Sequence, residues 1–208
     1  MKSTILNSPI SIGIGGQIGS GKTTVVKELI RLYQNDGYKV MLIDADRIAW
    51  RFYKQSTNIY KRIVKIFGIS ILDKKNNIDR KSLGKLVFKK PSNLTTLNKI
   101  VHPELIRQIK FELRKPNKQM KILDAALLFL WGKKIPVNIR ILVTAPAKQK
   151  IARMKKRGYN PIEVKTRLKR QIKESDMKAD ADFIINNNTT LAGLEDKTKK
   201  LYQILKNY

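Results

Sequence analysis

The sequence has no cysteine among its 208 residues. Disulfide bonds, thiol nucleophiles and thiolate metal sites are therefore excluded, and the composition permits a reducing compartment. Long apolar runs are also missing. The most apolar stretch, residues 122–131, is too short to cross a bilayer and is predicted to be a buried strand with its exit. Polar residues and a proline at 7–9 interrupt any signal-peptide pattern, so we expect a soluble cytoplasmic protein with no membrane partner.

Acidic residues are scarce relative to basic ones. The 44 lysines and arginines outnumber the 16 acids and leave a formal net charge of +28. Such a charge suits a nucleic acid or a polyanionic small substrate. However, the basic residues are spread along the whole chain, and aromatic residues make up only 7% of it, too few to indicate a stacking platform for single strands. We favour a solvated lysine-rich surface and keep a nucleic-acid-associated ATPase as an alternative.

Residues 16–23 read Gly-Gln-Ile-Gly-Ser-Gly-Lys-Thr and fit the P-loop pattern G-x-x-x-x-G-K-[ST] at every specified position. In such a loop the backbone N–H groups curl toward the β- and γ-phosphates. Lys22 places a positive charge between these phosphates, and the Thr23 hydroxyl binds Mg²⁺. Apolar spacing predicts a strand before the loop and a helix after it, so a chance glycine-rich turn is disfavoured. The chain is predicted to bind a nucleoside triphosphate.

Two predicted strands end in carboxylates. Residues 39–43 run into Asp44 and Asp46, and residues 121–124 end in Asp124. Parallel α/β folds bind ligands at the carboxyl ends of their strands. Beside Mg²⁺ and a γ-phosphate, one carboxylate can orient the attacking hydroxyl and accept its proton, and another can hold the metal through water. Asp46 also suits the N-cap of the following helix, and the two roles are compatible.

Residues 50–117 have a different pattern, helical with breaks at glycine, asparagine and proline residues. Pro103 is predicted to occupy the first position of a helix, where its missing N–H costs nothing, and apolar residues over 105–113 form one face. The only histidine, His102, then lies at a helix start, where a structural role is the ordinary interpretation.

Residues 147–178 carry many more bases than acids. A helix predicted over 147–158 places Arg153 and Arg157 one turn apart, and a second helix is predicted over 162–173. Like charges one turn apart repel each other, so they either face solvent or bind an anion. Behind a P-loop sheet, we favour a mobile arginine lid that closes over the triphosphate.

Taken in order, these motifs resemble the dephospho-CoA kinase family over nearly the whole chain. Many families share the P-loop, whereas the Asp44-Ala45-Asp46 and His102-Pro103 elements are specific in this order. The other matching elements are Asp79-Arg80 with Leu83, Val87-Phe88 with Pro91, Leu127-Leu128-Phe129, Gln149 with Arg153 and Arg157, Arg167 with Gln171, and Ala181-Asp182 with Ile184-Ile185 and Asn187.

The resemblance implies an α/β P-loop kinase fold, with a five-stranded parallel sheet flanked by helices, an inserted helical region that receives the CoA moiety, and a helical lid. The implied divisions are 1–49 and 118–146 for the nucleotide-binding core, 50–117 for the acceptor region, 147–178 for the basic lid, and 179–208 for the last strand and C-terminal helix. We expect a monomer.

The implied reaction is transfer of the ATP γ-phosphoryl group to the ribose 3′-hydroxyl of dephospho-CoA, with Mg²⁺. Carried over by position, Asp46 matches the catalytic base, Lys22 a phosphate ligand, and Arg157 a lid arginine that stabilises the transferring charge. Asp44, Arg80 and His102 match the acceptor region, and the metal falls to Thr23, Asp44 and Asp124. The expected ATP-binding residues are Gln17, Ile18, Gly19, Ser20, Gly21, Lys22, Thr23, Thr24, Arg153 and Asn187.

Four residues depart from the family pattern. Gln17 stands where a second glycine is usual, Ala126 replaces a proline, Leu130 a glutamate and Thr189 a glycine. Gln17 occupies a free position of the P-loop, so triphosphate binding is expected to survive. Leu130 keeps open an alternative of the same class, a P-loop kinase for another nucleotide or small alcohol.

Overall fold

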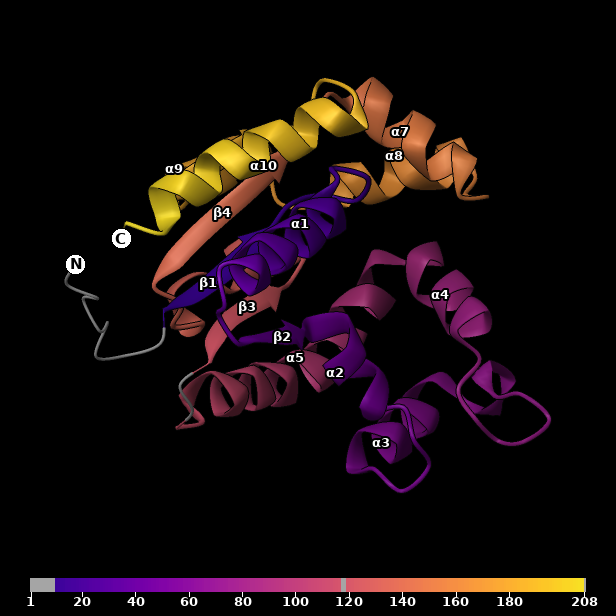
Figure 1. The fold of residues 1–208 in the computed structure, drawn as a ribbon. Coiled ribbons are helices and arrows are strands. Elements are labelled where there is room, and N and C mark those ends of the chain that lie inside the picture. The colour runs from indigo at the N-terminus through magenta and orange to yellow at the C-terminus, as the bar shows by residue number, and fades with distance from the viewer. Residues whose placement is uncertain (1–9, 117–118, 208) are drawn as a thin grey trace. The chain divides into compact units, whose positions relative to one another are not determined.

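The computed structural model describes residues 10–116 and 119–207. The five strands among these residues form one sheet in the order β2-β3-β1-β4-β5, and Figure 1 labels the first four of this order. The strands are β1 (Ser11–Gly15), β2 (Val40–Asp44), β3 (Met120–Asp124), β4 (Ile139–Thr144) and β5 (Phe183–Asn186). β1 pairs in parallel with β3 and β4, and β4 pairs in parallel with β5. The expected five-stranded parallel sheet of a P-loop kinase is confirmed.

The chain folds into two compact units. One is built from the residues before 44 and after 112, and the other from residues 44–112. The first unit holds α1 (Lys22–Asn35), α6 (Leu128–Trp131), η2 (Gly132–Lys134), α7 (Ala147–Lys156), α8 (Pro161–Arg170), α9 (Glu174–Ala179) and α10 (Leu191–Leu205). The second holds α2 (Ala45–Arg51), α3 (Asn58–Phe67), η1 (Ile69–Ile71), α4 (Arg80–Lys89) and most of α5 (Pro91–Arg114). None of the described helices combines the length and apolarity that a membrane crossing requires.

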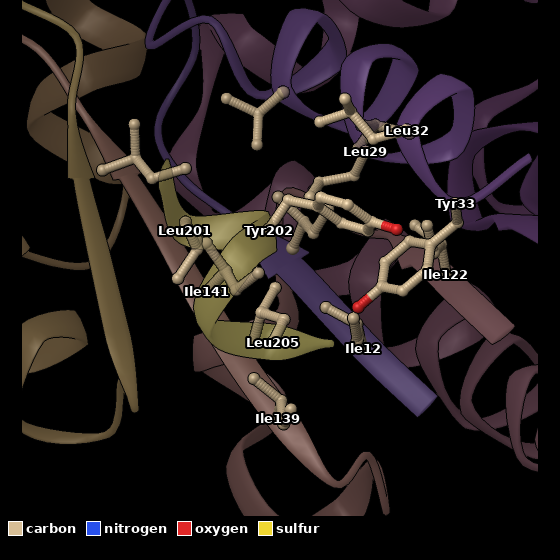
Figure 2. Packing of buried hydrophobic residues seen from close by; sticks show 14 of the residues in the cluster. Ile12, Leu29, Leu32, Tyr33, Ile122, Ile139, Ile141, Leu201, Tyr202 and Leu205 are labelled. Carbon is tan, nitrogen blue, oxygen red and sulfur yellow. The ribbon is translucent and has the colours of Figure 1, made fainter. Parts of the chain in front are cut away.

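Alternation along β1 decides what covers each face of the sheet. Ile12 and Ile14 are fully buried in the cluster formed with α1 and α10 (Figure 2). Gly13 and Gly15 lie on the opposite face, because successive residues of a strand point to opposite sides. A Cβ at Gly15 would lie 2.6 Å from the Phe129 ring of α6, so this face of β1 requires glycine for α6 to approach.

Tyrosine rings join α1 to α10 at the end of this core. The rings of Tyr33 and Tyr202 meet edge to face with centroids 4.7 Å apart (Figure 2). The Tyr202 hydroxyl donates a 2.5 Å hydrogen bond to Asp36, which also accepts a hydrogen bond from Lys206 Nζ at 3.0 Å. These hydrogen bonds hold the pKa of the Asp36 carboxyl below its ordinary value.

Two local expectations in the second unit are wrong. Pro103 does not begin a helix but lies inside α5, so His102 is also interior to that helix. Buried residues such as Leu97, Ile100 and Leu105 recur at helical spacing on both sides of the proline, and their packing outweighs the missing hydrogen bond.

Asp46 does not cap α2 either. The Asp44 side chain accepts a hydrogen bond from the Arg47 N–H at 2.9 Å and is the N-cap, whereas Asp46 lies in the first turn. Asp44 both ends β2 and caps α2, so the helix begins directly after the strand, at Ala45.

Candidate active site

The P-loop connects β1 to α1. Gly19 and Gly21 have φ angles of 75° and 101°, in the left-handed region that favours glycine. The Ser20 N–H donates to the Gln17 carbonyl at 3.1 Å, which closes a turn within the loop. The first turn of α1 carries no acidic side chain, so the positive end of the helix dipole is not offset there. This arrangement can receive phosphate groups.

Lys22 forms an ion pair with Asp124. Asp124 ends β3 and lies in register with Ile14 of β1, so the two parallel strands deliver the acid to the loop that carries the lysine. The two side chains are only 14% and 13% exposed. The structure therefore brings together two residues that the sequence predicted for the phosphate and metal sites.

The oxygens near Lys22 suit Mg²⁺ in part. Thr23 is exposed in the first turn of α1 and follows Lys22 directly in the sequence, and Lys22 is paired with Asp124. No cluster of three or more His, Cys, Asp or Glu side chains occurs among the described residues. Mg²⁺ commonly uses one or two protein oxygens and takes the rest of its ligands from water and substrate phosphates. The Thr23 hydroxyl and the Asp124 carboxylate are therefore sufficient as the ligands that the protein supplies to Mg²⁺.

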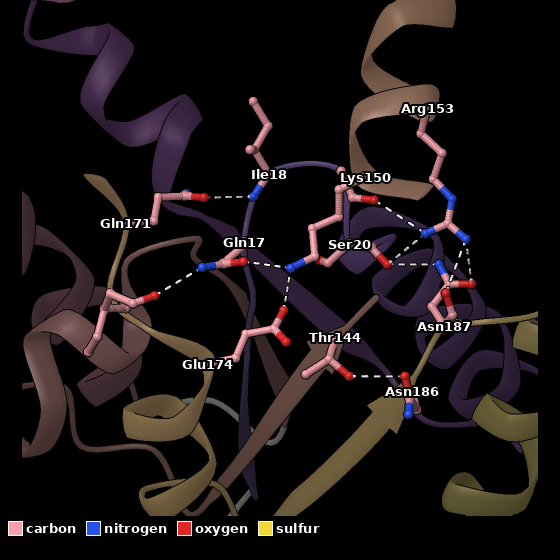
Figure 3. Close-up of polar contacts among 12 residues, drawn as sticks. Gln17, Ile18, Ser20, Thr144, Lys150, Arg153, Gln171, Glu174, Asn186 and Asn187 are labelled. Atoms are coloured by element: carbon pink, nitrogen blue, oxygen red, sulfur yellow. Dashed lines mark hydrogen bonds and ion pairs between the residues drawn. The ribbon is translucent and has the colours of Figure 1, made fainter. Parts of the chain in front are cut away.

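Asn187 and Arg153 hold the P-loop through its carbonyl groups (Figure 3). Asn187 is 4% exposed, and its Nδ2 donates to the Ser20 carbonyl at 2.7 Å. Its Oδ1 accepts from Arg153 at 3.0 Å, and Arg153 also donates to the Gly19 carbonyl at 3.3 Å. Burial lowers the pKa of Arg153, and the nearby charge of Arg157 lowers it further. The two residues expected at the ATP site thus buttress the loop in this structure.

A second set of contacts to the P-loop was not expected from the sequence. Lys150 of α7 is 3% exposed and donates from Nζ to Gln17 Oε1 at 2.5 Å, and it also pairs with Glu174 of α9. Gln171, the C-cap of α8, accepts the Ile18 N–H at 3.1 Å. One sequence signal could have indicated Lys150: it lies one helical turn before the apolar Met154, and the structure buries this face of α7.

Arg157 ends up away from these contacts. It is the C-cap of α7 and is exposed, and the left-handed Gly158 follows it. Beyond it, the Arg167 guanidinium of α8 lies 5.4 Å from the centre of the Tyr159 ring. The expected α7–α8 pair is therefore present, with its basic tip open to solvent.

In the second unit one predicted acceptor residue, Arg80, lies against an aromatic ring. The Arg80 guanidinium lies 3.5 Å from the centre of the Trp50 ring, which is 49% exposed. Burial raises the pKa of Tyr53, the positive charge of Arg80 opposes this shift, and the Asp46 carboxylate adds to it. Asp46 and Arg80 therefore both lie within electrostatic range of one hydroxyl.

His102 lies apart in α5, where burial lowers its pKa and favours the neutral imidazole. The predicted residues thus fall into two sets. The P-loop residues, Asp124, Arg153, Arg157 and Asn187 belong to the first unit, and Asp44, Asp46, Arg80 and His102 belong to the second.

The family model and the curated relatives give one family, and solved structures show the same fold. The family model for dephospho-CoA kinase matches residues 10–193. A dephospho-CoA kinase of Aquifex aeolicus is 33% identical over 195 residues, which cover 93% of this chain and 96% of that protein. The Thermus thermophilus protein TT1252 has a structure similar to this one, with a TM-score of 0.72 and 32% identity, covering 97% of this chain and 98% of that one. The dephospho-CoA kinase from Campylobacter jejuni shares the fold at a TM-score of 0.60 and 22% identity, covering 94% of this chain and 96% of that one.

Proposed function

The chain belongs to the dephospho-CoA kinase family, and we propose on this basis that it transfers the γ-phosphoryl group of ATP to the ribose 3′-hydroxyl of dephospho-CoA, giving coenzyme A and ADP. It is a phosphotransferase with an alcohol acceptor. The observation that carries the proposal is the family match over residues 10–193, which includes an intact P-loop with its lysine beside a strand-end carboxylate.

ATP is assigned to the first unit. The N–H groups of Ile18 and Ser20 are already used within the protein, so the remaining N–H groups of the P-loop and the Lys22 ammonium bind the triphosphate. Arg153 and Asn187 keep the loop in its curled shape through the Ser20 and Gly19 carbonyls. Thr23 and Asp124 would hold Mg²⁺, which supplies charge that offsets the phosphates. Lys22 and Asp124 pair with each other in this structure. With ATP and Mg²⁺ bound, Lys22 would pair with the phosphates and Asp124 with the metal.

The transfer step is assigned to Asp46 and Arg157. The Asp46 carboxylate accepts the proton of the 3′-hydroxyl as that oxygen forms its bond to the γ-phosphorus, and the bond to the β,γ-bridging oxygen breaks to leave ADP. Arg157, at the exposed tip of α7, stabilises the negative charge on the transferring group. Asp44, His102 and the Arg80 side chain held on Trp50 are assigned to the acceptor.

The first experiment measures ADP release by the purified protein with ATP, Mg²⁺ and dephospho-CoA, against a control without the acceptor. We expect release to depend on the acceptor and the product to carry one new phosphate at the ribose 3′ position. ADP release that is indifferent to dephospho-CoA would refute the acceptor assignment. A panel of nucleotides and small alcohols would then identify the acceptor of a related P-loop kinase.

Two substitutions test the assigned roles. Asp46→Asn is expected to abolish turnover and to leave ATP binding largely intact, because the amide cannot accept the proton. Arg157→Ala is expected to lower kcat by about 10³- to 10⁵-fold, the range for an arginine that stabilises a transferring phosphoryl group. Lys156→Ala removes a neighbouring exposed charge and serves as the matched control. Near-normal turnover in Asp46→Asn, or less than a tenfold effect in Arg157→Ala, would remove the role from that residue.

A further inference from the structure

Gln17 joins the P-loop to the segment between α8 and α9. Its Oε1 accepts a hydrogen bond from Lys150 Nζ at 2.5 Å, and its Nε2 donates to the Ile172 carbonyl at 3.1 Å (Figure 3). An ammonium can only donate and a carbonyl can only accept. The two partners therefore permit a single orientation of the amide, and both contacts require a side chain with one acceptor and one donor at this length.

The next P-loop residue makes a parallel connection. The Ile18 N–H donates to Gln171 Oε1 at 3.1 Å, so consecutive residues of the loop hold consecutive residues at the end of α8. Lys150 continues the network on the other side, because its buried ammonium also pairs with Glu174 in the first turn of α9. A buried charge needs such partners, which makes this arrangement costly to break.

The helix α7 is attached to the same loop. Gly19 approaches the α7 backbone so closely that an added Cβ would lie 2.7 Å from the Lys150 carbonyl oxygen. Arg153, one turn further along α7, donates to the Gly19 carbonyl. Both helices of the α7–α8 pair are thus anchored to the P-loop. Lys150 and Arg153 anchor α7, and Gln171 anchors the end of α8. Arg157 lies past the last anchor on α7.

We propose that Gln17 is a positioning residue that couples the P-loop to the base of the α7–α8 lid. The inference rests on the proposed kinase function and deepens it. When the P-loop closes on a triphosphate, the Gln17 amide passes the displacement of the loop on to α7 and α8. Movement of the lid is then confined to residues 154–170, which lie between the anchors Arg153 and Gln171. A residue without a side-chain amide at this position could not make both contacts, so the coupling depends on Gln17 itself.

The test compares Gln17→Ala, Gln17→Glu and, as a control, Gln34→Ala, which truncates an exposed glutamine in the last turn of α1. Gln17→Ala removes both contacts. Gln17→Glu has nearly the same shape and keeps an acceptor for Lys150, but it turns a carboxylate oxygen toward the Ile172 carbonyl. We expect both to lower kcat about 10- to 100-fold, the scale of a small misplacement of catalytic groups, and to leave the KM for ATP within about twofold, since Lys22 and the loop N–H groups remain. The control should match the wild type.

Hydrogen–deuterium exchange supplies a readout that needs no acceptor. ATP with Mg²⁺ is expected to slow exchange at residues 171–174 in the wild type and in Gln34→Ala, and to have no such effect in Gln17→Ala. If dephospho-CoA proves not to be the acceptor, this measurement still decides the coupling. Unchanged kcat, a raised KM with normal kcat, a wild-type Gln17→Glu, or ATP protection that survives in Gln17→Ala would each overturn the proposal.

Discussion

Replacing Asn187 by alanine would test whether the P-loop depends on support from the end of β5. In the structure this side chain donates to the Ser20 carbonyl at 2.7 Å and accepts from Arg153 at 3.0 Å, and it is 4% exposed. Alanine removes both hydrogen bonds in a place that water does not reach. The Ser20 carbonyl then retains only a long contact of 3.4 Å from Arg153.

The expected loss of stability follows from these two bonds. A neutral hydrogen bond contributes about 1 kcal/mol net, and one to a charged group about 1.5–3 kcal/mol. Arg153 keeps the backbone carbonyl of residue 187 and the Gln149 side chain as hydrogen-bond partners. The stability lost with its bond to the Asn187 side chain is therefore at the low end of the range for charged groups. The sum is about 2–3 kcal/mol, which for a chain of this length lowers the melting temperature by about 4–12 °C. Binding of ATP should weaken as well, because the unsupported loop must be ordered by the ligand.

The assay is thermal unfolding followed by circular dichroism, with and without ATP and Mg²⁺. Asn186→Ala is the matched control, since that neighbouring asparagine is exposed and makes a 3.3 Å contact with Thr144. We expect the control to change stability by less than about 0.5 kcal/mol. If Asn187→Ala also stays within that limit, or if its ATP-induced rise in melting temperature equals that of the wild type, the buttress is not needed.

Three further substitutions test other parts of the structure. Lys22→Met is expected to abolish turnover and lower the melting temperature, because Asp124 loses its partner. Adding Asp124→Asn to this variant should restore the melting temperature but not turnover. A further drop in the melting temperature of the double variant would contradict the pairing. The lowered pKa of Asp36, caused first by a tyrosine hydroxyl of α10, means that its carboxylate stabilises the fold above the ordinary value of 3.8 and that this contribution is lost as the pH falls through the lowered pKa. Asp36→Asn should therefore melt lower than the wild type at about pH 7 and alike near about pH 2, and equal melting at the higher pH would refute this. Gly15→Ala forces a Cβ to 2.6 Å from a phenylalanine ring of α6 and should cost about 1–3 kcal/mol in urea unfolding, whereas Gly84→Ala, with open space in α4, should not destabilise; a neutral Gly15→Ala would contradict the close packing.

Elements that depend on contiguous residues were predictable from the sequence. The strand, P-loop and α1 follow one another within residues 10–35, and each is specified by its own spacing of apolar residues and glycines. The strand that ends in Asp124 was recognisable for the same reason. The rule that parallel strands deliver their last residues to one edge of the sheet placed Asp124 at the same edge as the P-loop. The ion pair of Asp124 with Lys22 was not predicted and is seen only in the structure.

Local rules failed where tertiary burial opposed them. A proline is a strong helix-start signal, yet Pro103 lies within α5, because buried residues on both sides of it recur at helical spacing along one helix face. The capping signal of Asp46 was misplaced by two residues, since pairing in the sheet decides where β2 ends and Asp44 is the residue left at that boundary. Neither burial nor strand length can be obtained from the local motif alone.

The sequence by itself determined the P-loop, the acids at the strand ends and the family. Only the tertiary structure decided which residues support the loop. Gln17 is hydrogen-bonded to Lys150, which lies 133 positions away in the sequence, and Ser20 to Asn187, which lies 167 positions away. These meetings arise because β4 and β5 follow β1 in the sheet order, so the segments after all three parallel strands emerge at the same edge. A hydrogen bond forms only when its two atoms come within about 3 Å, and in this chain the sheet order, which no short motif records, brings those atoms together.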